Sequence, residues 1–82
     1  MPSPTQERIA AADATVLLFI VRYKRENDGN APTVREIMEN TPRSSTSLVL
    51  HSLDRLERQG RIKRTRGIAR GISLPKEEVT NE

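Results

Sequence analysis

The sequence predicts a small, mostly α-helical domain of three helices that ends in an antiparallel β-hairpin. Residues that cap helices precede three segments whose apolar residues recur at helical spacing. After Gly60 that spacing changes from helical to alternating, which is typical of a hairpin. With 82 residues the chain is expected to form one domain over residues 1–75, followed by a flexible acidic tail over 76–82.

The first helix is expected to begin at Pro4, because Ser3 can cap it and Gln6 can complete a capping box. Its charged residues near the carboxyl end are expected to form a solvated side: Arg22, Lys24, Arg25 and Glu26. Gly29 favours an end within residues 27–30. Asp13 is an alternative helix start, which leaves open a break or kink near residues 11–13.

The second and third helices are short and lie close together in the sequence. Thr33 and Glu36 predict a capping box for the second helix, which Pro42 ends because proline disfavours helical geometry in the residue before it. Ser44 or Ser45 is expected to cap the third helix, over about residues 45–59.

One side of the third helix is aliphatic. Val49, Leu53 and Leu56 are spaced four and three residues apart, so they form one stripe that we expect to face the first two helices. The hairpin follows over 61–74, with a turn at residues 67–69. Four alternating positions flank this turn: Ile62, Arg64, Ile72 and Leu74.

Composition excludes several classes of site. The absence of cysteine removes disulfides, thiolate zinc sites and thiol nucleophiles, and His51 is the only histidine. Phe19 and Tyr23 are the only aromatic residues, which speaks against single-strand binding by base stacking. We expect no enzyme activity, no cofactor, metal or small-molecule ligand, and no membrane span, and a soluble, cytoplasmic protein is the default expectation.

Positive charge is concentrated near the carboxyl end. The net charge is only +3, yet residues 1–60 are balanced, with eight basic and eight acidic side chains. Residues 61–74 contain no acid and five basic residues: Arg61, Lys63, Arg64, Arg66 and Arg70. Such a segment is expected to bind phosphates, although a charged hairpin edge can also serve only to discourage aggregation.

Two helices joined by a short turn, followed by a basic hairpin, predict a winged helix-turn-helix that binds double-stranded DNA. With the aliphatic stripe turned inward, the exposed positions of the third helix are Thr46, Ser47, Leu50 and His51, with Leu48 on the flank. These residues can also have roles other than DNA contact: the hydroxyls can cap the helix, and the leucines can belong to the core or to a dimer surface. The full set predicted to contact DNA is Arg35, Arg43, Ser45, Thr46, Ser47, Leu48, Leu50, His51, Arg64, Arg66 and Arg70.

Four segments resemble the amino-terminal DNA-binding domain of LexA-type repressors. They are Phe19-Ile20-x-x-Tyr23, Gly29-x-x-Pro32-Thr33-x-Arg35-Glu36-Ile37, Leu53-x-x-Leu56-x-x-x-Gly60-x-Ile62 and Ala69-Arg70-Gly71-Ile72-x-Leu74. Together they cover roughly residues 14–74. The Pro-Thr-x-x-Glu-Ile and Arg-Gly-Ile patterns are specific in combination, though neither is so alone.

The resemblance implies a three-helix winged domain whose third helix enters the major groove and which binds a two-fold operator as a dimer. By position, the family's base-contacting residues fall on Ser45, Ser47, Leu48, Leu50 and His51. These differ in character from the polar and acidic residues of the family, so its target sequence is not expected to carry over. The family's peptidase domain has no counterpart in these residues, so self-cleavage is not expected.

The leading hypothesis is therefore a sequence-specific transcriptional regulator, expected to be a repressor. One alternative is a winged-helix module for protein interaction or dimerisation, in which Leu48 and Leu50 form the interface. Another is a DNA-binding accessory factor in replication or excision. The operator sequence, the oligomeric state and whether the chain is a fragment of a longer protein stay open.

Overall fold

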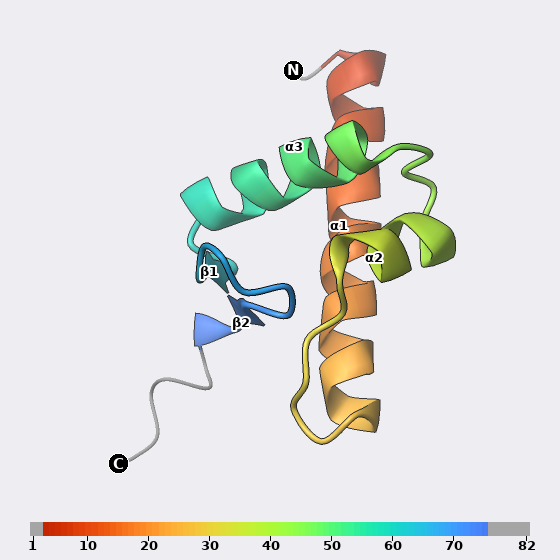
Figure 1. The fold of residues 1–82 in the computed structure, drawn as a ribbon. Helices are drawn as coiled ribbons and strands as arrows, with labels where there is room; N and C mark the ends of the chain where they lie inside the picture. The colour runs from red at the N-terminus through yellow and green to blue at the C-terminus, as the bar shows by residue number, and fades with distance from the viewer. Residues whose placement is uncertain (1–2, 76–82) are drawn as a thin grey trace.

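A computed structural model describes residues 3–75, which form three helices followed by a two-stranded antiparallel sheet (Figure 1). The helices are α1 (Pro4–Glu26), α2 (Val34–Asn40) and α3 (Thr46–Arg58), and the strands are β1 (Lys63–Arg64) and β2 (Ile72–Ser73). The predicted fold class, a winged helix-turn-helix, is confirmed. The acidic tail expected over residues 76–82 lies outside the described residues. In the part of the chain that the structure describes, no helix is both long and apolar enough to cross a membrane.

Helix α1 is continuous, and the break or kink allowed near residues 11–13 does not occur. Its start is the predicted one: the Ser3 hydroxyl accepts a hydrogen bond from the Gln6 backbone N–H, and Gln6 Oε1 accepts one from the Ser3 backbone N–H. Asp13 does not cap a second helix. Asp13 lies in the middle of α1 and is buried. Its carboxylate bonds to two arginines from other parts of the fold.

Lys24 was expected on the solvated side of the first helix, and this prediction is wrong. The residue is buried, and its ammonium group donates to the carbonyl oxygens of Gly29 at 2.8 Å and Ile72 at 3.2 Å. Burial of a charged amine is tolerated because these carbonyls replace hydrogen bonds to water. Lys24 thus connects the end of α1 with strand β2.

The caps of α2 and α3 follow the sequence closely. Thr33 and Glu36 form the predicted capping box of α2, and Thr41 ends that helix in extended geometry before Pro42. Of the two serines considered for α3, Ser45 is the cap, since its side chain accepts a hydrogen bond from the Leu48 amide at 3.2 Å. The connection between the two helices is therefore only a few residues long.

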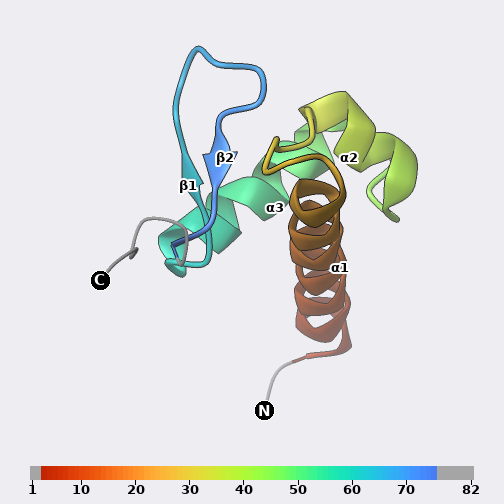
Figure 2. The same cartoon turned by 90° about the horizontal axis from the view of Figure 1, so that it is seen from below.

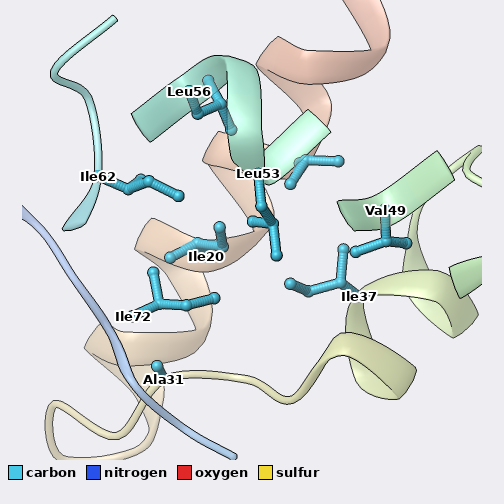
Figure 3. Packing of buried hydrophobic residues seen from close by; sticks show 9 residues of the cluster. Ile20, Ala31, Ile37, Val49, Leu53, Leu56, Ile62 and Ile72 are labelled. Carbon is cyan, nitrogen blue, oxygen red and sulfur yellow. The ribbon is translucent and has the colours of Figure 1, made fainter. Parts of the chain in front are cut away.

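The core lies where α3 crosses α1 and α2 (Figure 3). Val49, Leu53 and Leu56 are all buried, as predicted, and they pack with Val16 and Ile20 of α1. Ile37 of α2, Ala31, Ile62 and Ile72 complete the cluster. Since the core takes up one side of α3, the opposite side of that helix faces solvent.

The hairpin lies beside the carboxyl-terminal half of α3 in both views (Figures 1 and 2). Lys63 pairs with Ser73 and Arg64 with Ile72, which makes the regular strands shorter than the alternating pattern suggested. We refer to residues 65–71, which join the two strands, as the wing loop. Two backbone bonds close it: the Thr65 amide donates to the Gly71 carbonyl at 2.7 Å, and the Gly71 amide donates to the Ile68 carbonyl at 3.1 Å.

A buried ionic network centred on Asp13 joins α1, the turn before α3, and α3 itself. Arg55 donates to both carboxylate oxygens, at 2.7 and 3.0 Å, and Arg43 approaches one of them at 3.5 Å. Arg43 also donates to the buried Ser52 hydroxyl at 2.9 Å. Burial alone would raise the pKa of Asp13, but the hydrogen bonds from Arg55, Ser52 and Arg43 outweigh it and hold the pKa below its ordinary value of 3.8.

We expect Asp13→Asn to lower the free energy of unfolding by about 2–3 kcal/mol at pH 7, because it leaves two arginines without their anionic partner. A group with a lowered folded pKa contributes stability at pH values above its unfolded pKa, and that contribution is lost as the pH falls through the folded value. The difference between wild type and variant, measured by urea unfolding, should therefore shrink below pH 4. Glu26→Gln, an exposed change on the same helix, serves as the control and should cost less than about 0.5 kcal/mol. Equal stability of wild type and the Asp13 variant would contradict this account of the turn.

Candidate nucleic-acid interface

The amino-terminal half of α3 presents a compact exposed surface. Thr46, Ser47, Leu48, Leu50 and His51 are all exposed, although the helix is anchored on its other side by the aliphatic stripe. Leu48 and Leu50 are 36% and 45% exposed. Hydroxyl and imidazole groups can bond to base edges, and leucine can contact the methyl group of thymine. This side of α3 therefore carries the chemical groups needed to read a major groove.

The serines before α3 divide into two roles. Ser45 is half-buried and its hydroxyl is engaged in the cap, so the ordinary explanation from helix capping applies to it. Ser44 is exposed in the turn, and Ser47 is exposed one residue inside the helix. Ser47 is thus better placed than Ser45 for a contact outside the protein.

The hairpin and α3 border the same hollow, with a volume of about 230 Å³. Leu50 and Leu53 of α3, Val34 at the start of α2, and the wing loop line it. Figure 2 shows the wing loop projecting beside α3 on the side where α2 also lies. The loop is not turned away from α3, so the two elements present a shared surface.

The basic residues of the hairpin region are not equivalent. Arg61, Lys63 and Arg66 are exposed. Arg64 is half-buried, and its guanidinium contacts Glu57 at 2.9 Å and Asp54 at 3.7 Å on α3. Arg70 bonds to Glu36 of α2 at 2.8 Å. The acids that pair with these two arginines come from outside the segment 61–74, so their side chains do not project freely as the local sequence suggested.

The two arginines predicted near the helix-turn-helix turn also differ. Arg35 is highly exposed, with only a 4.0 Å approach to Glu39 on the next turn of α2. The Arg43 side chain is 12% exposed and directed inward to Asp13 and Ser52. Arg43 therefore holds the turn in place and does not project toward the surface, where the predicted contact with the DNA backbone would need it.

Ile68 is an exposed residue outside the predicted set that lies beside the candidate site. The sequence predicts it only as part of the turn, but its side chain is 59% exposed in the wing loop and borders the hollow next to α3. The signal in the sequence is an isolated branched apolar residue inside a glycine-containing turn. Among residues 3–75, no three histidine, cysteine or acidic side chains gather into a group that would hold a metal ion.

Comparison with known proteins agrees with this geometry. The family model for the LexA DNA-binding domain matches residues 6–71, which include α2, α3, the wing loop and all but the first two residues of α1. The chain belongs to the LexA DNA-binding domain family. The predicted resemblance is thereby confirmed over residues 14–71, and the match begins further toward the amino end, at residue 6.

Several LexA repressors are similar to this family member. The repressor of Roseiflexus sp. (strain RS-1) is 34% identical over 70 residues, which is 85% of this chain and 32% of the relative. The repressor of Citrifermentans bemidjiense is 38% identical over 68 residues, covering 83% of this chain and 33% of the relative. That of Carboxydothermus hydrogenoformans is 37% identical over 67 residues. The chain thus spans about a third of the length of the curated relatives it matches.

The wing loop of this LexA-family domain requires glycine at position 71. A Cβ atom there would lie 2.5 Å from the Thr65 carbonyl oxygen and 3.0 Å from that of Ile68, and both oxygens belong to the backbone. We expect Gly71→Ala to destabilise the loop by about 1–3 kcal/mol and to weaken the bond between residues 65 and 71. Amide exchange at Thr65 should become about tenfold faster or more.

Gly67→Ala is the matched control. Gly67 has a φ of +80° but open space around it, so alanine there introduces backbone strain of about 1 kcal/mol without a clash. It should leave the bond between Thr65 and Gly71 in place. If the Thr65 amide exchanged as slowly in Gly71→Ala as in Gly67→Ala, the close backbone approach at Gly71 would not constrain the loop.

Proposed function

We propose that this chain binds double-stranded DNA in a sequence-specific manner and acts as a transcriptional repressor. In this proposal α3 enters the major groove and the hairpin contacts phosphates beside it. The observation that carries the proposal is the exposed polar and leucine side of α3, held outward by a buried stripe on the same helix. Membership of the LexA DNA-binding domain family supports the same function.

The proposed contacts fall into two groups. Thr46, Ser47, Leu48, Leu50 and His51 read bases, because they occupy the exposed side of α3. Arg66 and Arg35 contact phosphates, since both guanidinium groups are available at the surface. Arg43, Ser45 and Arg64 contribute by holding the turn, the helix start and strand β1 in position.

A repressor of this kind is proposed to bind a two-fold site as two copies. One small domain offers few base contacts, so a single half-site should be bound only modestly, and linkage of two copies would raise the overall affinity. We propose a regulator rather than an enzyme, located where the DNA is, which for a bacterial-type repressor is the cytoplasm.

The phosphate contact is tested on a duplex of random sequence. Arg66→Ala should weaken binding to all duplexes alike and lower the slope of log K against log salt by about 0.9, the value for one phosphate. Arg22→Ala, which removes an exposed arginine on α1, is the control and should leave the slope unchanged. An unchanged slope for Arg66→Ala would remove this residue from the phosphate contacts.

Base reading is tested by selecting preferred sites from random duplex DNA. Ser47→Ala or His51→Ala should change the preference at one or two positions by about 1–3 kcal/mol per lost contact. The selected site should be a two-fold repeat. A selection that enriches no sequence, or the same site for wild type and both variants, would exclude these side chains from base reading.

A protein-docking role has one specific observation in its favour. Leu50 and Ile68 are exposed apolar residues that line one hollow, and Leu48 is also exposed on α3. Absence of binding to any duplex even at low salt would favour this alternative over DNA binding.

A further inference from the structure

The guanidinium of Arg70 joins the wing loop to three other segments of the fold. Its Nη1 donates to the Tyr23 hydroxyl at 3.0 Å, to the Ala31 carbonyl at 2.8 Å and to Glu36 Oε1 at 2.8 Å, while Nη2 approaches Glu36 Oε2 at 3.3 Å. The guanidinium carbon also lies 5.8 Å from the centre of the Tyr23 ring.

Glu36 is also held in place by two hydrogen bonds from residues other than Arg70. Its Oε1 accepts from the Thr33 amide at 2.8 Å, as part of the α2 capping box, and its Oε2 accepts from the Tyr23 hydroxyl at 3.2 Å. The hydrogen bond from Arg70 and that from the Thr33 backbone lower the pKa of Glu36 to about 2. The carboxylate is therefore ionised at every pH at which the protein is expected to bind DNA.

Core contacts and the bond from Lys24 to the Ile72 carbonyl anchor the hairpin strands, and the wing loop extends beyond them. Each strand of the hairpin has two residues, and an isolated two-stranded hairpin is marginally stable in water. On the β1 side, Arg64 ties the hairpin to Glu57 and Asp54 of α3. On the other side, Arg70 ties the loop to α2 and to the end of α1.

We propose that Arg70 is a positioning residue, whose bonds to Glu36, Tyr23 and the Ala31 carbonyl hold the wing loop at the angle to α3 needed for Arg66 and Ile68 to meet DNA. It acts through the loop instead of binding a phosphate itself. This inference rests on the proposed DNA-binding function, since the loop direction matters only if the loop contacts the duplex. A loop that is already ordered in the free protein loses less entropy on binding, which favours affinity.

Glu36→Gln tests whether Arg70 contacts phosphate directly or positions the loop, because the two roles predict opposite changes in DNA affinity. If Arg70 contacted phosphate directly, removal of a neighbouring negative charge would strengthen DNA binding. If Arg70 positions the loop, loss of the paired ionic hydrogen bonds between Arg70 and Glu36 should weaken DNA binding by about 3- to 10-fold, the cost of ordering one or two side chains. The glutamine keeps an oxygen that can accept from the Thr33 amide, so the helix cap is retained.

Glu39→Gln is the matched control on the same helix. Glu39 is exposed and meets only Arg35, at 4.0 Å, so its loss should leave affinity unchanged or raise it slightly. Weaker binding by the Glu36 variant, together with unchanged or stronger binding by the Glu39 variant, supports positioning.

Arg70→Lys is compared with Arg22→Lys, which replaces an exposed arginine of α1 outside the proposed interface. Arg22→Lys keeps the charge and should bind as wild type does. Arg70→Lys keeps the charge, but lysine cannot form the two parallel hydrogen bonds to Glu36, so its affinity for DNA should fall by about 3- to 10-fold. Its wing loop should also be more mobile in the free protein, measured by ¹⁵N relaxation at Ile68, with the helices unchanged.

Failure of this inference is distinguishable from failure of the proposed function. If wild type binds no duplex, DNA binding is wrong, and the relaxation of Ile68 in Arg70→Lys still reports whether Arg70 orders the loop. If wild type binds DNA while Arg70→Lys and Glu36→Gln bind equally well or better, the positioning role is overturned. An equally ordered loop in Arg70→Lys would overturn it as well.

Discussion

Burial of three aliphatic side chains on α3 is the constraint on which the rest of the structure depends. Val49, Leu53 and Leu56 pack against Val16 and Ile20 of α1, and this contact fixes the rotation of α3 about its own axis. Residues on the opposite side of the helix are therefore exposed regardless of their polarity, which explains why Leu48 and Leu50 face solvent.

Charged contacts between distant parts of the chain then fix what lies on either side of α3. Asp13 gathers Arg43 from the turn and Arg55 from α3, which holds the turn against α1. Arg64 and Arg70 hold the hairpin on two sides. Several residues expected to bind DNA thus shape the surface, while exposed Arg66 and Arg35 stay available for a ligand. The hydrophobic core orients α3, and ion pairs orient the elements beside it.

Features that depend on near neighbours were predictable from the sequence, whereas those that depend on distant residues were not. The caps at Ser3 and Thr33 and the stripe on α3 follow from spacings of three and four residues, and all were confirmed. Asp13, in contrast, was considered a possible helix start because its arginine partners lie 30 and 42 residues away. Lys24 and Arg70 likewise bond to residues 48 and 34 positions away. The acidic partners of Arg64 lie closer, on α3, but outside the acid-free segment 61–74.

The central claim is that the exposed side of α3 and the wing loop form one DNA-binding surface. The most direct measurement is a titration of ¹⁵N-labelled protein with a duplex selected from random DNA, followed by amide chemical shifts. We expect the largest changes at residues 46–51 and 65–71, with little change around Leu18 and Arg22 on the exposed side of α1. Changes centred on that side of α1, with none in α3, would contradict the account.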